Sequence, residues 1–409
     1  MAAESVAMAS APASAAALAV LGGAPAFSAP LHVGRPNVGD EERFFGRARE
    51  IFARRWFSNN GACVREFEER MKSLLGVRHC IPIANATIAL EIAIRALDFK
   101  GEVIVPSFTF VATAHALQWQ EITPIFCDID PRTHTLDPAK IERLITPRTT
   151  GIIGVHLWGR ACALEAIDEI AKRRGLRVMY DAAHAFACSH GGRMIGNFGE
   201  AEVFSFHATK FLNTFEGGAI ATNDDSLADR MRLMKNFGFA GYDKVIYVGT
   251  NGKMNEMSAA MGLTGLDSLE EFIAVNRANH EAYGRALAGI PGITLTAYDP
   301  ANRNNYQYVV CEVEAGEFGL TRDELTRALH AENVLARRYF APAAHRMEPY
   351  ISYYPNAGLL LPETERLCER VISFPTGTAI NDGHIARICD LVRRAHEWAP
   401  EVRAALAKA

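Results

Sequence analysis

The stretch AEVFSFHATKFLNTFEGGAIAT, residues 201–222, contains a single lysine, Lys210, between two short apolar runs. The first run leads into a polar cluster that holds Lys210, and the pair Gly217-Gly218 opens the second. This pattern predicts a strand, a turn that carries the lysine, and a second strand. Large apolar side chains flank Lys210, so partial burial is expected to lower its pKa and free its amine for imine formation. For a lysine taken alone, a surface loop is the more common environment.

The overall composition is that of a soluble globular protein. The chain has 409 residues, of which 49% are hydrophobic, and this length accommodates two or three domains. A formal net charge of −4 gives no global electrostatic reason to bind nucleic acid or an anionic membrane. The eight cysteines are scattered and form no C-x-x-C pair, which favours reduced thiols in the cytoplasm over a structural zinc site.

The first thirty residues are rich in alanine and serine and could be mistaken for a signal peptide. They contain an acid, Glu4, and no lysine or arginine precedes Arg35, so the basic start of a signal peptide is missing. We therefore expect residues 1–30 to form a flexible leader. Because no apolar run reaches the length needed to cross a bilayer, we expect a cytoplasmic protein.

From residue 40 to residue 180 the pattern alternates between helices and strands. Two helices are expected within 40–75, separated by a turn at residues 58–61. Strands are then expected at 80–84, 102–106, 123–127, 151–156 and 176–180, with helices at 87–97, 110–118, 138–144 and 163–173. Apolar strands spaced by helices predict a mainly parallel sheet covered on both faces. Ligands of such folds bind beyond the carboxyl ends of the strands.

The pattern changes near residue 264. A long amphipathic helix is expected at 266–287, followed by strands at 293–297 and 306–313 and helices at 321–332 and 382–395. We therefore predict a large α/β domain over residues 31–264 and a smaller α+β domain over residues 265–409.

Three side chains near the predicted strand ends could hold a flat ring. Asp181 ends an apolar strand, and a carboxylate at that depth needs a cationic partner such as a protonated ring nitrogen. His184 follows three residues later, and Phe110 lies where its ring could stack on a ligand. Taken singly, Asp181 could equally cap a helix, His184 could be a hydrogen-bonded structural histidine, and Phe110 could belong to the core.

A phosphate site is expected beside these side chains. Ala86 and Thr87 open a predicted helix, whose first N–H groups bind anions, and Ser205 adds a hydroxyl five residues before Lys210. An amine, a carboxylate for a ring nitrogen, a stacking ring and a phosphate cradle are together what pyridoxal 5′-phosphate (PLP) requires. The set therefore predicts a PLP enzyme in which Lys210 binds the cofactor.

On these residues the chain resembles the DegT/DnrJ/EryC1/StrS family of sugar aminotransferases, from about residue 45 to residue 390. The motifs that carry the resemblance lie at residues 58–61, 66–68, 85–87, 105–110, 128–131, 181–185, 205–210, 216–218 and 251–254. The resemblance implies the type I aminotransferase fold of PLP enzymes, with a mainly parallel seven-stranded sheet. It also implies ping-pong transfer of an amino group from L-glutamate, which leaves as 2-oxoglutarate, to a keto-deoxysugar nucleotide.

The family's ring-binding and catalytic residues are carried over position by position. Lys210 is implied to form the imine with the cofactor and then to move the proton. Asp181 is implied to pair with the ring nitrogen, and His184 to lie by the phenolic oxygen of the ring. Phe110 is implied to stack on the ring.

The resemblance also implies how the phosphate is bound. Ala86 and Thr87 offer backbone N–H groups, and Ser205 offers its hydroxyl. Asn251 is similar to the asparagine that reaches the phosphate from the neighbouring subunit, which implies a homodimer with shared active sites. The chain departs from the family in having Ala86 in place of glycine and Gly252-Lys253 in place of an aromatic-arginine pair. The alanine keeps its N–H available, whereas the change at Lys253 leaves the role of that side chain open.

Within the family, the motifs at residues 155–160, 204–219, 236–239 and 376–380 resemble aminotransferases acting at C4 of dTDP-4-dehydro-6-deoxy-D-glucose in desosamine-type antibiotic pathways. Spacing and charge do not distinguish a C4 from a C3 ketone, so a 3-aminotransferase remains the alternative. A related branch that removes a sugar hydroxyl has histidine at the position of Lys210. A non-catalytic, PLP-bound regulatory protein would be expected to lose Lys210 or Asp181, or to add a DNA-binding domain.

The pyrophosphate of a sugar nucleotide needs cationic partners. Arg337, Arg338 and His345 are candidates, as is Lys253 from a partner subunit. For Arg337 and Arg338, a solvated basic helix end is an equal alternative.

Overall fold

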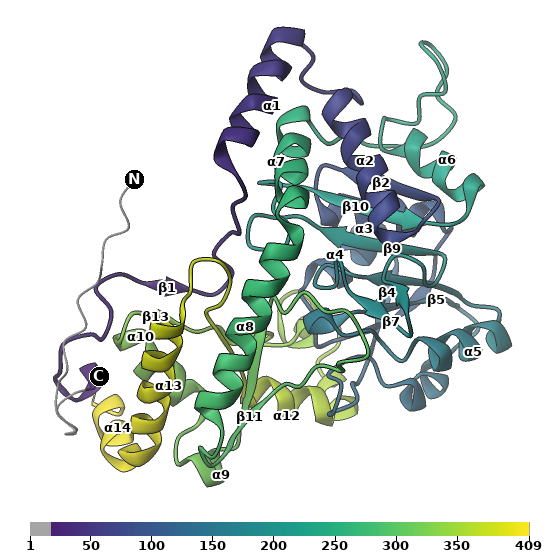
Figure 1. Ribbon diagram of the computed structural model, residues 1–409. Helices are drawn as coiled ribbons and strands as arrows, with labels where there is room; N and C mark the ends of the chain where they lie inside the picture. The colour runs from purple at the N-terminus through teal and green to yellow at the C-terminus, as the bar shows by residue number, and fades with distance from the viewer. Residues whose placement is uncertain (1–17, 409) are drawn as a thin grey trace.

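The structure, a computed structural model, describes residues 18–408 and has two domains joined side by side (Figure 1). The large domain is built on a sheet of seven strands. In spatial order these are β2 (His79–Ile83), β10 (Gly218–Thr222), β9 (Ala201–Ser205), β6 (Arg177–Asp181), β5 (Thr149–Val155), β3 (Glu102–Pro106) and β4 (Thr123–Cys127). Only β10 runs antiparallel to its neighbours, and the five strands from β9 to β4 are all parallel. The predicted mainly parallel, seven-stranded α/β fold is confirmed.

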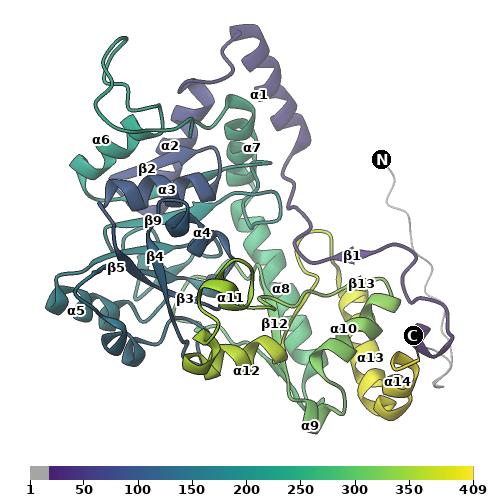
Figure 2. The same cartoon turned by 180° about the vertical axis from the view of Figure 1, so that it is seen from behind.

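Helices cover both faces of this sheet because alternate strand residues point to opposite sides. Val203 packs with α3 (Ala86–Ala96), α4 (Ala112–Gln118) and α6 (Asp225–Met234) on one face, and Figure 2 shows α3 and α4 lying over the strands. Its neighbour Phe204 packs on the other face with α2 (Ala62–Leu75) and α7 (Glu256–Asp267). The same opposite face carries α5 (Leu164–Arg174) farther along the sheet, and α1 (Glu41–Arg54) packs against α7.

The small domain surrounds a three-stranded antiparallel sheet. Its strands are β11 (Ile293–Leu295), β12 (Val309–Val313) and β14 (Val371–Phe374), and its helices are α8 (Leu269–Leu287), α9 (Ala315–Phe318), α10 (Arg322–Ala331), α11 (Tyr350–Tyr353), α12 (Pro362–Arg370), α13 (Asp382–Glu397) and α14 (Ala399–Leu406). Short elements complete the fold: β7 (Ser189–His190), β8 (Arg193–Met194), and 3-10 helices at Ala19–Leu21, Pro138–Lys140, Glu142–Leu144, Leu157–Gly159, Ala344–Arg346 and Ala357–Leu360.

The predicted long helix at 266–287 is confirmed as α8, which begins at Leu269 rather than at residue 266. Ser268 separates it from α7, a helix that was not predicted. The helix α7 packs on α1 and α2 of the large domain, whereas α8 packs on α13 of the small domain (Figure 1). The change of packing partners therefore lies four residues beyond the domain boundary predicted at residue 264.

The prediction of a flexible leader over residues 1–30 is wrong for residues 18–30, and residues 1–17 lie outside the described part. The side chain of Leu18 is only 3% exposed and belongs to the small-domain core. The carboxylate of Glu332 accepts hydrogen bonds from the N–H groups of Ala19, at 2.6 Å, and Ala26, at 2.8 Å. Next in the chain, β1 (Leu31–His32) pairs in parallel with β13 (Val334–Leu335), so this segment belongs to the small domain rather than the large one.

Across the described residues 18–408, every helix is too short or too polar to cross a membrane.

Candidate active site

A cavity of about 410 Å³ lies where the carboxyl ends of the strands face the small domain. Its walls include all but one of the predicted site residues, namely Ala86, Thr87, Phe110, Asp181, His184, Ser205 and Lys210. The small-domain side is contributed by Gln307, Tyr308, Arg337, Tyr339 and Phe340, and by Val33 and Gly34 of the N-terminal segment. The fold thus brings together residues that are up to 307 positions apart in sequence, from Val33 to Phe340.

Lys210 lies in the hairpin loop between β9 and β10, as the strand–turn–strand pattern predicted. The loop is closed by hydrogen bonds from Phe206 N–H to the Gly217 carbonyl, at 2.9 Å, and from Lys210 N–H to the His207 carbonyl, at 2.8 Å. The Lys210 side chain is half-buried and lines the cavity. Burial lowers its pKa from 10.5 to about 8, although the negative charge of Asp181 acts in the opposite direction. About a tenth of the amine is therefore free at pH 7, far more than for a lysine with the ordinary pKa of 10.5.

Asp181 is the last residue of β6 and is 6% exposed. One carboxylate oxygen accepts from the Thr113 hydroxyl at 2.8 Å, and the other accepts from the Ala183 N–H at 3.0 Å. Burial raises the pKa of Asp181 despite these two hydrogen bonds. Among residues 18–408 no lysine, arginine or histidine lies within ion-pair distance of this carboxylate, and the charge of Lys210 acts on it only from farther away. A buried carboxylate without an ion-pair partner can accept a cationic group of a ligand.

His184 is buried against aromatic rings. Its imidazole stacks on the Trp158 indole, with ring centroids 5.5 Å apart and planes 26° from parallel, and it lies 4.3 Å from the Tyr308 ring centroid. The backbone N–H of Trp158 points to Nδ1 of His184 at 3.5 Å. Burial, followed by the charge of Lys210, holds the pKa of His184 well below its ordinary value. The imidazole is therefore neutral at physiological pH.

The groups predicted to bind the phosphate lie at three neighbouring strand ends. Asn85 caps α3, since its side chain accepts from the Ile88 N–H at 2.9 Å. This leaves the N–H groups of Ala86 and Thr87 free of acceptors within the described chain, at the positive end of the helix. Ser205 is paired with Gly218 in the sheet, and Gly218 is paired with Ile83, which leads into α3.

Gly218 is required for this close packing. A Cβ at this position would lie 2.8 Å from the backbone nitrogen of Ala86 and 2.8 Å from the Phe204 carbonyl oxygen. Real Cβ atoms do not approach backbone atoms so closely, so any larger residue would push β10 away from the start of α3. Gly218 thus permits close backbone packing beside the lysine loop.

Phe110 is 60% exposed although it is a large apolar residue. It follows β3 and lines the cavity instead of packing in the core. This excludes the alternative that Phe110 is a core residue, and leaves its ring free to stack on a flat ligand.

The residues proposed for anion binding are separated by the fold. Arg337 lines the cavity, with its guanidinium 5.5 Å from the Tyr339 ring centroid. Arg338 instead pairs with Asp323 at 3.2 Å, away from the cavity. The prediction of a pyrophosphate role for His345 is wrong, because its ring is 1% exposed and is bonded to Ser107 at 2.7 Å and to Glu365. Among the site residues, only Asn251 stands apart from the cavity of its own chain, and it is exposed.

Several cavity residues were given no role by the sequence reasoning. They are Gln307, Tyr308, Tyr339 and Phe340 of the small domain, to which Trp158 is added because it stacks on His184 without lining the cavity itself. Trp158 lies within the motif at residues 155–160, and that motif could have indicated a role for Trp158 near the site. Gln307 and Tyr308 fall in the strand predicted at 306–313, but nothing in that pattern marked them as site residues, and Tyr339 and Phe340 lie in a segment for which no element was predicted.

The amino-acid sequence matches known proteins over most of its length. Residues 39–393 match the model of the DegT/DnrJ/EryC1/StrS aminotransferase family. The chain belongs to this family. Aminotransferases of this family are PLP-dependent, which confirms the predicted enzyme class and cofactor. The free N–H groups at the start of α3, the unpaired Asp181 and the half-buried Lys210 all fit PLP.

Individual relatives span nearly the whole chain. The dTDP-4-amino-4,6-dideoxy-D-glucose transaminase of Shigella dysenteriae is 36% identical over 366 residues, which are 89% of this chain and 98% of the relative. The GDP-perosamine synthase of Caulobacter vibrioides is 36% identical over 325 residues, 78% and 86% of the two chains. A crystal structure of DesI in the presence of its TDP-sugar product is 47% identical, with a TM-score of 0.90, and the match covers 96% of this chain and 99% of DesI.

Proposed function

We propose that this aminotransferase transfers the amino group of L-glutamate to C4 of dTDP-4-dehydro-6-deoxy-D-glucose, forming 2-oxoglutarate and a 4-amino sugar nucleotide. The observation that carries the proposal is the single cavity that joins Lys210, Asp181 and the start of α3. Support for the sugar comes from the similarity to DesI and to the Shigella dysenteriae transaminase, whose names specify a TDP-sugar product and a 4-amino sugar. These names favour C4 over C3.

When bound, PLP acts as an electron sink for charge at the carbon that loses its proton, and carries the amino group between the two substrates. Lys210 would move this proton, because its Nζ, with a pKa of about 8, can accept the proton from Cα of glutamate and pass it to the cofactor carbon that takes up the amino group. Asp181 holds the ring nitrogen in its protonated form, and the bonds from Thr113 and Ala183 keep its carboxylate oriented. Neutral His184 offers one ring nitrogen to the phenolic oxygen.

The phosphate and the substrate are bound by separate groups. The N–H groups of Ala86 and Thr87, together with the Ser205 hydroxyl, bind the phosphate at the positive end of α3. Phe110 stacks on the ring from the cavity side. Arg337 is the cation that meets the pyrophosphate or carboxylate of the substrates, since it lines the cavity and its charge is not paired with an acid of the described chain.

We further propose that the enzyme works as a cytoplasmic homodimer with shared sites. Asn251 is exposed and lies outside its own cavity, beside a loop with exposed apolar side chains that include Tyr242 and Val248. A second copy packed on this loop would cover these side chains and bring Asn251 and Lys253 to the partner's site. All eight cysteines are free thiols, which suits a reducing compartment.

The sugar assignment is tested by offering the purified enzyme 3-keto and 4-keto dTDP-6-deoxyhexoses with L-glutamate and locating the new nitrogen by NMR. Nitrogen at C4 is the expected result, and nitrogen at C3 contradicts the assignment. For shared sites, mixing an Asn251→Ala chain with a Lys210→Ala chain is expected to create hybrid dimers whose affinity for PLP differs from that of either parent. Affinities that equal the average of the two parents would place each site within one chain.

A further inference from the structure

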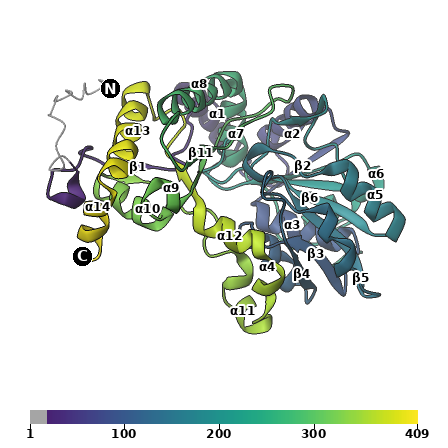
Figure 3. The same ribbon diagram turned by 90° about the horizontal axis from the view of Figure 1, so that it is seen from below.

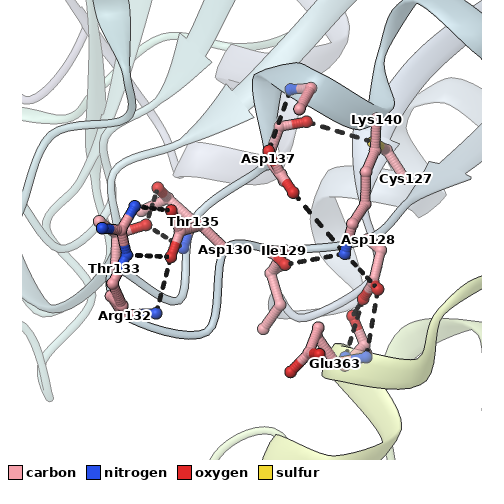
Figure 4. Close-up of polar contacts among 12 residues, drawn as sticks. Cys127, Asp128, Ile129, Asp130, Arg132, Thr133, Thr135, Asp137, Lys140 and Glu363 are labelled. Carbon is pink, nitrogen blue, oxygen red and sulfur yellow. Dashed lines mark hydrogen bonds and ion pairs between the residues drawn. The ribbon is translucent and has the colours of Figure 1, made fainter.

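Asp128 is a buried carboxylate that the proposed mechanism does not use. It follows the last residue of β4, and its side chain is 0% exposed. It belongs to the motif at residues 128–131, one of the motifs that carry the family resemblance, but it does not line the cavity. Figure 4 shows its carboxylate between Lys140 of the large domain and Glu363 of the small domain. A charge held so deeply must be balanced by specific partners.

The partners of Asp128 come mainly from the first turn of α12. One oxygen accepts from the N–H and the hydroxyl of Thr364, both at 2.8 Å. The other accepts from the Glu363 N–H, at 3.1 Å, and from the ammonium of Lys140, at 2.9 Å. Although burial acts to raise the pKa of Asp128, the bonds from Lys140 and Thr364 hold it below its ordinary value. The carboxylate is therefore ionised and saturated with donors.

These bonds make Asp128 the cap of a helix in the other domain. The residue that precedes α12, Leu361, makes no side-chain cap hydrogen bond, and Pro362 follows it. A helix start normally takes its cap from a neighbouring Ser, Thr, Asp or Asn. Here the acceptor comes from Asp128, more than 230 positions away in sequence, and its negative charge meets the positive end of the helix. Figure 3 shows α12 between the two domains.

The same helix holds the segment of residues 337–346 that faces the cavity. Glu365 of α12 pairs with His345 and, at 2.7 Å, with Arg346. The thiol of Cys368 donates to the Phe340 carbonyl at 3.1 Å. The Phe340 ring stacks on Trp158, with centroids 5.7 Å apart, and on His184, at 6.1 Å. A displacement of α12 would therefore be transmitted to the cavity wall.

We propose that Asp128 is a positioning residue: by capping α12 across the domain boundary, it holds the 337–346 segment against the cavity and thereby sets the affinity of the site for its substrates. The inference rests on the proposed function for its choice of L-glutamate as the probe. It is independent of the identity of the sugar.

The test compares two carboxylates that share a partner. Asp137 also contacts Lys140, at 3.7 Å, and caps the 3-10 helix Pro138–Lys140, but it makes no bond to α12. Single turnovers of the holoenzyme with L-glutamate, without sugar, are followed by the absorbance of the bound cofactor. Asp128→Asn is expected to raise the half-saturating glutamate concentration about fivefold. This is the change in an equilibrium constant that corresponds to the typical free-energy cost of losing a helix cap. Its maximal rate should change less than about twofold, and Asp137→Asn should leave both values near wild type.

A second readout reports the segment itself. In the holoenzyme, amide hydrogen exchange of peptides covering residues 337–346 and 362–370 is expected to be faster in Asp128→Asn and unchanged in Asp137→Asn. Faster exchange with an unaltered glutamate half-saturation would overturn the proposal, because Asp128 would then only stabilise the fold. Equal effects of both variants would also overturn it, since Lys140 would be the common cause.

A milder variant keeps the proposal testable if Asp128→Asn folds poorly. Thr364→Val keeps the side-chain shape and removes one donor to Asp128. It is expected to raise the glutamate half-saturation about twofold, and an unchanged value would contradict the proposal. A wild-type enzyme that does not react with L-glutamate would contradict the proposed donor instead, whereas failure on the 4-keto sugar alone would leave this test intact.

Discussion

The two sides of the cavity are built in different ways. On the large-domain side, Asp181, Ser205 and Lys210 all lie within five residues of a strand end, and their loops are closed by short-range hydrogen bonds. On the small-domain side, the 337–346 segment is mostly without regular structure and is held by α12 and by Trp158. The difference indicates that groups for the chemistry are positioned locally, whereas groups for the substrate depend on the contact between domains.

The largest effect on kcat is expected for a substitution on the large-domain side of the cavity, at Lys210. Lys210→Ala removes the amine that binds the cofactor and moves the proton, so kcat should fall by about four orders of magnitude or more. Steady-state assays with glutamate and the sugar nucleotide measure this loss, and borohydride treatment of the wild type should attach the cofactor to the peptide that contains Lys210. The exposed Lys172, paired with Asp168 on the surface, provides the control Lys172→Ala. An active Lys210→Ala enzyme would remove Lys210 from the mechanism.

Asp181→Asn tests the same side of the cavity without removing the amine. The amide keeps the size of the side chain but cannot hold a protonated ring nitrogen, so kcat should fall by about two orders of magnitude. The position of the cofactor absorbance band should change as well, which reports the ring nitrogen directly. Asp168→Asn, at an exposed position, should leave kcat and the spectrum as in the wild type. A normal spectrum in Asp181→Asn would mean that another group faces the nitrogen.

The sequence predicted the large-domain side because its signals are local. A strand, a short polar loop and the next element place Asp181, Lys210 and Ala86 at one edge of the sheet, and no distant contact is needed to recognise them. The fold class followed from the same alternation of strands and helices. The same local reading included His184 and Ser205, both of which line the cavity, whereas the motifs shared with the family added Asn251, whose role stays a prediction.

The small-domain side could not be predicted because its determinants are distant in sequence. Phe340 faces the cavity through contacts with Trp158, 182 positions earlier, and no periodic pattern marks it. His345 was predicted to bind an anion, but in the structure it is buried against Ser107, which lies 238 positions away in sequence. The leader was mispredicted for the same reason, since Ala19 is fixed by Glu332, 313 positions later.

A pair of adjacent arginines tests the substrate side. Arg337 lines the cavity and Arg338 pairs with Asp323 outside it, so the two positions differ in location but not in chemistry. Arg337→Gln should raise the KM of the sugar nucleotide about tenfold and change kcat less than about threefold, as expected for one lost charge-assisted contact. Arg338→Gln should leave both constants close to those of the wild type. Equal KM values for the two variants would show that the substrate does not meet Arg337.

The smallest expected effect concerns the pH dependence of stability. In the cofactor-free protein, burial lowers the pKa of Lys210 from 10.5 to about 8. Below about pH 8 the folded state carries the cost of burying a charged amine, whereas between about 8 and 10.5 only the unfolded state binds the proton. Stability rises with pH wherever the unfolded state binds more protons, so the free energy of unfolding gains a favourable contribution over this window.

Lys210→Met, which keeps the length of the side chain without its charge, lacks this contribution. Urea unfolding of both cofactor-free proteins from about pH 7 to about pH 10 should show Lys210→Met as the more stable protein at the lower pH, with the difference shrinking as the pH rises. A difference that stays constant over this range would mean that Lys210 is not desolvated.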